Sequence, residues 1–383
     1  MSEMRSDQRS LFEVAAYFFR LSWTAFGGPL AYIAMMEDDC VEKRKWLSKE
    51  EFAEMLGITN MLPGPNATEM AIHIGYVKGG KLGAIMSGLA FTLPSFVIMV
   101  VLSWLYFQYG SLPAVGGIFY GINPVVVGII VITALRLGKV SLTDWKLVVI
   151  CITVFLLSQV SNMNEALILL GAGAAGIILY GHVLKKTLLA VPVFLQLSFF
   201  ISVDFERLPL FLQLFLEFLK GGLLLFGSGL VIIPLLGPDI VDFFGWMSYK
   251  EFFDGLTLGQ VTPGPVMKTA AFVGYKVAGI GGAAAAMSGI FLPPFIFVTL
   301  LAPYFRKVRT NIWLQGFLKG VKAGAVGVIL GVVPSLSGVA FTDLLTIVIC
   351  LLSMTIMLKT KVNLSVLVIL SGLLGALLRV VRF

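Results

Sequence analysis

Long apolar runs recur along almost the whole chain, and they constrain its fold more than any other feature. The first begins near Leu11, the last ends near Arg382, and several are long enough to cross a hydrocarbon core of ~30 Å. Hydrophobic residues make up 58% of the 383 residues and charged residues only 13%, which is too little polar surface for a water-soluble globule of this size. We therefore predict an all-α polytopic membrane protein without a separate soluble domain.

The sequence also repeats itself at an offset of close to 200 residues. The matched motifs are Phe26-Gly27 with Phe226-Gly227, Trp46 with Trp246, Glu51-Phe52 with Glu251-Phe252, Pro63-Gly64-Pro65 with Pro263-Gly264-Pro265, and, with slips of one residue, Gly75-Tyr76 with Gly274-Tyr275 and Gly121 with Gly320. A match sustained over this length is typical of transporters that are built from two copies of one module.

Each copy contains six hydrophobic segments. They cover residues 11–36, 52–77, 81–108, 112–135, 146–160 and 164–181 in the first copy, and 211–236, 252–276, 279–303, 315–335, 343–358 and 363–381 in the second. We predict an N-terminal repeat over residues 1–186, a C-terminal repeat over residues 211–383, and an apolar linker over residues 187–210. The linker contains the stretch from Leu188 to Val203, which is just long enough for an extra crossing.

Loop charges reverse their bias between the two copies. The loop from Gln108 to Pro113 carries no charge, whereas its counterpart contains two arginines and a lysine at residues 306, 307 and 309. Because basic loops stay on the cytoplasmic side, the two repeats are predicted to have inverted topology. Two arrangements give this inversion: six spans per repeat with the linker as an extra crossing, or five spans and one re-entrant hairpin per repeat. Charge alone leaves both open.

Glycine and proline motifs interrupt two segments of each copy. The motif Phe26-Gly27-Gly28-Pro29 lies in the first segment, Pro63-Gly64-Pro65 lies in the second, and the second copy has its counterparts at Phe226-Gly227 and Pro263-Gly264-Pro265. Paired prolines remove backbone donors, so the helices should break or re-enter at these motifs. The helix that resumes after a break presents unpaired N–H groups and a partial positive charge, which favour an anion. Two Ser-x-x-Glu capping boxes, at Ser48 and Ser248, predict the helix starts that lead into the Pro-Gly-Pro breaks.

Polar residues gather around the breaks, as expected of an anion site near the middle of the membrane. The candidate substrate-binding residues are Phe26, Gly27, Gly28, Asn60, Pro63, Gly64, Pro65, Asn66, Thr68, Phe226, Gly227, Gln260, Pro263, Gly264, Pro265, Lys268 and Thr269. Candidates for the anion path or for coupling are Arg20, Lys220 and Glu69. Lys268 is the strongest, because an ammonium in an apolar segment needs an anion or a carboxylate, and Glu69 of the other copy is the alternative partner. Arg20 and Lys220 either feed the site or lie at an interface.

Taken together, the motifs Phe26-Gly27-Gly28-Pro29, Pro63-Gly64-Pro65 with Gly75-Tyr76, and Gln260-x-Thr-Pro-Gly-Pro265 with Gly274-Tyr275 resemble those of the chromate transporter family in its long form, over nearly the whole chain. The resemblance implies a secondary transporter that exports chromate, or a related tetrahedral oxyanion such as sulfate, across the bacterial inner membrane. Ser228-Gly229 departs from the first copy's Gly28-Pro29. An anion channel, or a transporter of a different small anion, is the alternative function.

Other functions find little support in the sequence. No phosphate-binding loop, His-Glu-x-x-His or Gly-x-Ser-x-Gly motif is present, so we expect neither an enzyme nor a cofactor. The two histidines, His73 and His182, lie too far apart in the sequence to suggest a metal site. The net charge of +7 fits basic cytoplasmic loops and does not require nucleic acid. The expected partners are a small inorganic oxyanion and the lipid bilayer, and a homodimer is left open.

Overall fold

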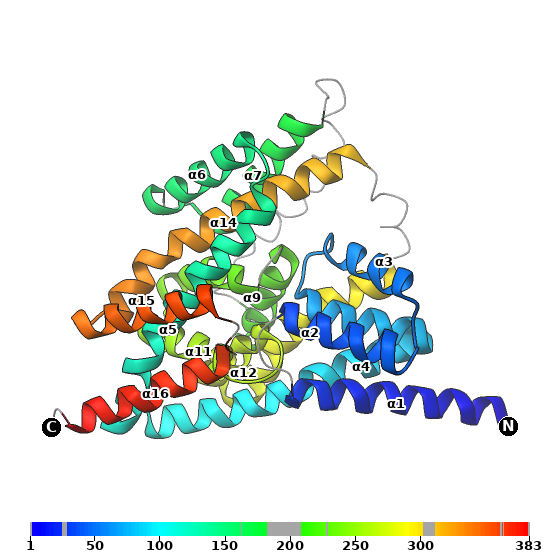
Figure 1. The fold of residues 1–383 in the computed structure, drawn as a ribbon, viewed down its shortest axis with the longest axis horizontal. Helices are drawn as coiled ribbons and strands as arrows, with labels where there is room; N and C mark the ends of the chain where they lie inside the picture. Colours follow the sequence, from blue (N-terminus) through cyan, green and yellow to red (C-terminus); the bar gives the residue numbers. More distant parts are fainter. Residues whose placement is uncertain are drawn as a thin grey trace.

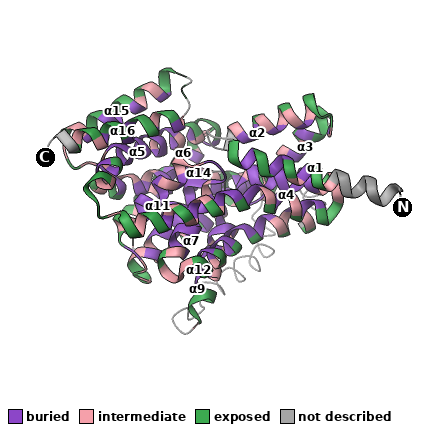
Figure 2. Ribbon diagram, turned by 90° about the horizontal axis from the view of Figure 1, so that it is seen from below, coloured by how far each residue is buried: buried purple, intermediate pink, exposed green. Residues whose placement is uncertain are grey.

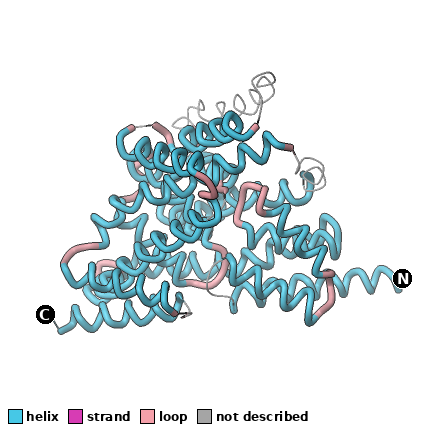
Figure 3. Tube along the Cα trace, turned by 45° about the horizontal axis from the view of Figure 1, so that its top comes forward, coloured by secondary structure: helices cyan, strands magenta, loops and turns pink. Residues whose placement is uncertain are grey.

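The computed structural model describes residues 2–24, 29–161, 163–181, 208–226, 229–301, 311–360, 362 and 364–381. Almost all of these residues are helical, and none of them is in a strand (Figures 1 and 3). The predicted all-α polytopic fold is therefore confirmed.

Helices follow one another in the same order in the two halves of the chain. The first half contains α1 (Ser2–Thr24), α2 (Pro29–Glu37), the π-turn η1 (Asp38–Lys43), α3 (Lys49–Thr59), α4 (Asn66–Tyr109), α5 (Pro113–Ser141), α6 (Trp145–Val160) and α7 (Glu165–Tyr180). The second half contains α9 (Leu210–Leu224), η4 (Gly229–Val231), α10 (Ile232–Pro238), the π-turn η5 (Asp239–Phe243), α11 (Tyr249–Val261), η6 (Val266–Lys268), α12 (Thr269–Ile296), η7 (Phe297–Leu301), α14 (Ile312–Ala340), α15 (Leu344–Lys359) and α16 (Leu364–Val381). By length and composition, four helical stretches among the described residues could cross a membrane: Asn66–Tyr109, Pro113–Ser141, Val266–Leu300 and Ile312–Ala340.

Helices α4 and α12 each fold back on themselves. At Gly80 and Gly279 the backbone has φ of 58° and 60°, a left-handed conformation that glycine adopts without strain. A methyl group on Gly83 would overlap the carbonyl oxygen of Gly75, although eight residues of continuous helix would separate them by ~12 Å. Each helix thus consists of two antiparallel arms, which correspond to the separate hydrophobic segments predicted from the sequence.

The two halves exchange their C-terminal helices. Helices α6 and α7 of the first half pack against α14 of the second, and α15 and α16 of the second half pack against α5 of the first (Figure 1). The crossings are close because glycines face backbone: a methyl group at Gly121 would overlap the carbonyl oxygen of Ser371, and one at Gly176 would overlap that of Gly316. Small residues allow this approach, which replaces the hydrophobic driving force that is missing between helices in lipid.

Many large apolar side chains are exposed on the outer surface. Buried residues gather toward the centre of the helix bundle (Figure 2). Along α4, the side chains of Ile85, Leu89, Leu93, Val97 and Val101 are 46–48% exposed and recur at every fourth residue. A continuous apolar stripe of this kind is unfavourable in water and favourable in the acyl region of a bilayer. The chain is an integral membrane protein.

The predicted linker over residues 187–210 lies almost wholly outside the described residues, including the stretch from Leu188 to Val203. The repeat boundaries at residues 1–186 and 211–383, and the inverted topology, stay predictions.

Replacing Gly121 by alanine should destabilise the exchanged helix packing, because the new methyl group has no room beside Ser371. Overpacking of this kind costs about 1–3 kcal/mol. The thermal unfolding midpoint in detergent measures the effect. Gly171→Ala is the matched control, since nothing lies within 4 Å of the methyl group that it adds. Equal midpoints for the two variants would contradict the described packing.

Candidate functional site

The helices that lead into the Pro-Gly-Pro breaks begin with the predicted capping boxes. Ser48 Oγ accepts from the backbone N–H of Glu51 at 3.1 Å, and the Glu51 carboxylate accepts from the N–H of Ser48 at 2.8 Å. Ser248 and Glu251 form the same pair of bonds at 3.2 and 2.9 Å. Helices α3 and α11 therefore have fixed starting points from which they run into the breaks.

Both Pro-Gly-Pro motifs interrupt the helices, as predicted. Residues 60–65 and 262–265 are non-helical, and Gly64 and Gly264 have φ of 150° and 97°, which side-chain-bearing residues rarely adopt. We call these two stretches the first and second Pro-Gly-Pro loops. Prolines 65 and 265 occupy the N-cap positions of the helices that resume, and neither helix has a side-chain cap. No side chain therefore caps the N–H donors at these two helix starts, although the N–H groups of Thr68 and Lys268 bond the carbonyl oxygens of Pro65 and Pro265.

An ion pair shows how the two helices on either side of the second Pro-Gly-Pro loop are arranged. Lys276, near the end of the first arm of α12, bonds at 2.8 Å with Glu251 in the first turn of α11. The start of α11 therefore lies beside the end of that arm, and the two run antiparallel. The second Pro-Gly-Pro loop is the tip of this helical hairpin.

The first Pro-Gly-Pro loop contacts the break at Phe226-Gly227 in the other half. The backbone N–H of Gly64 donates to the carbonyl oxygen of Leu225 at 2.7 Å. On the far side of that break, a methyl group on Gly229 would lie 2.9 Å from Met267 Cε. The second-half break is thus flanked by the first Pro-Gly-Pro loop and by the helix that resumes after the second.

The second Pro-Gly-Pro loop contacts residues on both sides of the break at Phe26-Gly27-Gly28. The Tyr32 hydroxyl accepts from the N–H of Gly264 at 2.7 Å and donates to the carbonyl oxygen of the same residue at 3.1 Å. A methyl group on Gly264 would overlap Ser95 Cβ and lie 3.5 Å from Ser22 Oγ. Ser22 is fully buried and its hydroxyl has no hydrogen-bonding partner among the described residues.

The structure thus brings both Pro-Gly-Pro loops together with the flanks of both breaks. Phe226 is half-buried, with its ring 6.3 Å from that of Phe317. Four of the predicted site residues lie outside the described part of the chain: Phe26, Gly27, Gly28 and Gly227.

Lys268 is fully buried, and its ammonium lies on the second Pro-Gly-Pro loop. It donates to the carbonyl oxygens of Thr262 and Pro263 at 2.7 Å and to that of Gly264 at 3.2 Å. The side chain neither extends to the surface nor forms an ion pair with a described carboxylate. Among the described residues, its polar partners are carbonyl oxygens alone.

Glu69 does not pair with Lys268, so this alternative for the lysine is wrong. The Glu69 side chain is fully buried, and neither carboxyl oxygen has a hydrogen-bonding partner in the described part of the chain. A methyl group on Gly64 would lie 2.6 Å from Glu69 Oε1, so the carboxyl group packs directly on the first Pro-Gly-Pro loop. The site holds one buried cationic and one buried acidic group, each on a different loop.

The amide side chains differ between the two loops. Asn66 donates to Asn60 at 2.7 Å and bridges the first Pro-Gly-Pro loop. In the second loop, Val266 occupies the position that corresponds to Asn66, and the buried Gln260 amide nitrogen has no partner among the residues that the structure describes. The buried Thr68 Oγ1 likewise lacks a partner in the described ranges, whereas Thr269 donates to the carbonyl oxygen of Val266 at 3.2 Å.

The matched basic residues Arg20 and Lys220 lie in different surroundings. Lys220 forms ion pairs with Asp239 and, at 2.7 Å, with Glu217, and its side chain is 11% exposed. Arg20 is exposed on α1. Lys220 therefore links α9 to η5 through Asp239, while Glu217 pairs with it within α9. The two positions do not form a symmetric pair of anion-binding residues.

Comparison with known proteins finds one family profile that matches the chain twice, once in each half. The sequence profile of the chromate transporter family matches residues 12–177 and again residues 212–376. The chain belongs to the chromate transporter family. Among its relatives, a probable chromate transport protein of Synechococcus elongatus is 36% identical over 350 residues, which cover 90% of this chain and 89% of the relative.

Two further relatives share the full two-repeat length of this chromate transporter family member. The chromate transport protein of Cupriavidus metallidurans is 35% identical over 361 residues, 92% of this chain and 89% of its own. That of Pseudomonas aeruginosa is 32% identical over 384 residues, 95% of this chain and 91% of its own. No solved structure matches the chain.

Sequence reasoning missed three residues of this site in the family member: Ser22, Tyr32 and Ser95. Each lies in the first half, while the loop that they contact lies in the second. Their only sequence signal is a polar side chain within an apolar segment, and many serines and tyrosines share it.

Replacing Tyr32 by phenylalanine should loosen the second Pro-Gly-Pro loop, because the N–H of Gly264 loses its partner and the carbonyl oxygen keeps only Lys268, at 3.2 Å. A buried group left unpaired costs about 1–3 kcal/mol, so the thermal unfolding midpoint should fall by several degrees. Tyr109→Phe is the control, since Tyr109 is 45% exposed. An unchanged midpoint in Tyr32→Phe would show that the hydroxyl does not hold the loop.

Proposed function

We propose that this chain is a secondary transporter that exports chromate, or a related tetrahedral oxyanion such as sulfate, across the bacterial inner membrane. The family assignment and the names of the relatives, which are chromate transport proteins, support chromate as cargo. One structural observation carries the location of the site: each Pro-Gly-Pro loop contacts residues that flank the break in the other half.

This meeting point has the properties of an anion site. Two helix starts without side-chain caps supply N–H donors and partial positive charge. The Lys268 ammonium lies on the second loop and the Ser22 hydroxyl beside it. An oxyanion that entered here would offer the lysine stronger acceptors than neutral carbonyls, because charge-assisted hydrogen bonds are roughly twice as strong.

The antiparallel hairpin of α11 and the first arm of α12 supports the arrangement with five spans and a re-entrant hairpin in each repeat. In this arrangement the Pro-Gly-Pro loop is the tip of a hairpin that enters the membrane and leaves on the same side. Non-helical backbone at that depth is tolerated because protein covers it. Opposed hairpins from inverted repeats would place the two tips at the midplane, where secondary transporters bind substrate.

The membrane potential favours export. When a dianion leaves a cell with a negative interior, its electrical free energy falls by roughly 4.6 kcal/mol per 100 mV, twice the value for a single charge. Uniport driven by the potential therefore needs no further energy source, and exchange against another ion is the second way to drive the cycle.

Replacing Lys268 by methionine should abolish chromate flux in proteoliposomes, because methionine keeps the apolar stem but removes the charge that holds the anion. Labelled chromate, sulfate, molybdate and phosphate are compared with and without an imposed potential. Chromate should also raise the thermal unfolding midpoint of the wild type but not of Lys268→Met.

Lys139→Ala, at an exposed position on α5, is the matched control and should transport at the wild-type rate. Unchanged flux in Lys268→Met would remove the lysine from the site. Single-channel currents in planar bilayers would instead identify an anion channel, because alternating access is too slow to produce them.

Glu69 is proposed as the coupling group, since its unpartnered carboxyl group lies on the first Pro-Gly-Pro loop and can bind a proton. Wild-type flux at fixed potential should then vary with pH, while Glu69→Gln, which cannot bind a proton, should transport at a rate independent of pH. Glu50→Gln, at an exposed position in the first turn of α3, is the control. Identical pH profiles for Glu69→Gln and the wild type would rule out this role and would favour uniport.

A further inference from the structure

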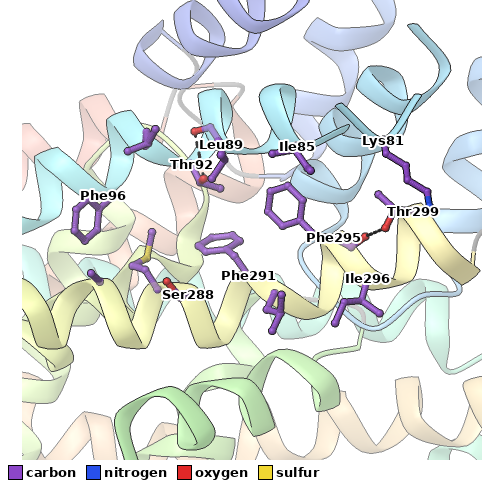
Figure 4. A pocket seen from close by; sticks show the side chains of 14 residues that line it. Lys81, Ile85, Leu89, Thr92, Phe96, Ser288, Phe291, Phe295, Ile296 and Thr299 are labelled. Atoms are coloured by element: carbon purple, nitrogen blue, oxygen red, sulfur yellow. Dashed lines mark hydrogen bonds between the residues drawn. The ribbon is translucent and has the colours of Figure 1, made fainter. Parts of the chain in front are cut away.

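A groove with a volume of about 580 Å³ lies between the second arms of α4 and α12, away from the Pro-Gly-Pro loops (Figure 4). Its walls come from both halves of the chain. Lys81, Leu89 and Phe96 line it from α4, and Ala284, Phe295 and Thr299 line it from α12 and η7. This volume is within the range of sites that enclose a drug-sized molecule, ~300–1,000 Å³.

The groove is apolar along its length and cationic at one end. Figure 4 shows Lys81 reaching from α4 toward Thr299, with Phe291 and Phe295 between the two helices and Phe96 at the opposite end. Phe295 occupies the space above Gly88, where a methyl group would overlap its ring. No carboxylate is among the residues that line the groove. The Lys81 side chain is exposed, so its ammonium is accessible to a ligand from outside the protein.

The position of Lys81 fits a membrane interface. It directly follows the reversal of α4 at Gly79 and Gly80, where the chain turns back into the bundle. Lys78, on the other side of this turn, lies 5.9 Å from the ring of Trp46. Lysine and tryptophan are the residues that anchor helix ends at the headgroup level.

The groove runs inward from this turn. Lys81 and Phe96 are fifteen residues apart on one helix, about 22 Å at 1.5 Å per residue. One leaflet contributes roughly half of the ~30 Å hydrocarbon core, so the groove is long enough for an acyl chain whose headgroup remains at Lys81.

We propose that this groove binds an anionic phospholipid, with one acyl chain between α4 and α12 and the phosphate on the Lys81 ammonium. The apolar walls match the chain, and the single lysine at the interfacial end matches the charge. A second copy of this protein fits less well, because the groove would offer no carboxylate to the lysine of either copy. Bound in this way, the lipid contacts both halves along the helices that carry Ser95 and Pro294, which touch the Pro-Gly-Pro loops from the other side.

Native mass spectrometry of the purified, delipidated protein tests the proposal. Phosphatidylglycerol and phosphatidylcholine with identical acyl chains are added in turn, and bound lipid is counted at each concentration. The wild type should bind phosphatidylglycerol more tightly. Lys81→Ala should weaken phosphatidylglycerol binding roughly fivefold, the effect of about 1 kcal/mol for one lysine at a membrane surface, and should leave phosphatidylcholine binding unchanged.

Two further variants separate the groove from general surface charge. Ala284→Phe places a ring in the open groove from an exposed position and should reduce the binding of both lipids, with the unfolding midpoint confirming that the protein folds. Lys139→Ala removes an exposed lysine outside the groove and should bind both lipids as the wild type does.

Equal losses of phosphatidylglycerol in Lys81→Ala and Lys139→Ala would overturn the proposal, as would unchanged binding in Ala284→Phe. A disulfide-linked dimer of Leu89→Cys in membranes would also overturn it, because a second copy would then fill the groove. None of these measurements depends on the transported anion.

Discussion

The structure depends on how backbone groups are satisfied where helices stop inside an apolar bundle. A membrane offers no water to the N–H and C=O groups that a break releases, so protein atoms must replace it. Here some of the partners come from the opposite half: the Gly64 N–H donates to Leu225, and both backbone groups of Gly264 bond the Tyr32 hydroxyl. The Lys268 ammonium donates hydrogen bonds to three carbonyl oxygens of its own loop. Each Pro-Gly-Pro loop therefore has at least one backbone group whose hydrogen-bonding partner lies in the other half.

The close packing of small residues makes this arrangement accessible. Glycines at the crossings of α5 with α16 and of α7 with α14 bring backbones together without intervening side chains. Glycines at the reversals of α4 and α12 let each helix return along itself within two residues. At the crossings, neighbouring backbone occupies the space that a side chain would need. At the reversals that space is open, and the positive φ is what favours glycine.

Local features of this fold could be predicted from the sequence. The hydrophobic segment at residues 146–160 corresponds to α6 at Trp145–Val160, and that at 343–358 to α15 at Leu344–Lys359. Both capping boxes and both Pro-Gly-Pro breaks are confirmed, because a cap or a proline acts within one turn of helix. The exchange of C-terminal helices could not be predicted, since hydropathy reports burial and not the partner. For the same reason, the sequence shows that Lys268 lies in an apolar segment. Its carbonyl acceptors and its lack of an ion pair with Glu69 can be seen only in the three-dimensional structure.

The exchange of C-terminal helices has a consequence for how the chain is made. Helix α5 ends at Ser141, whereas the helices that cover it, α15 and α16, begin at Leu344 and Leu364. Because synthesis proceeds from the N-terminus, the glycine face of α5 leaves the ribosome long before its partners exist. Until α15 and α16 have been synthesised, lipid or the insertion machinery must cover the glycine face of α5. Final assembly is then a late step, in which α16 is inserted next to a helix made more than half a chain earlier.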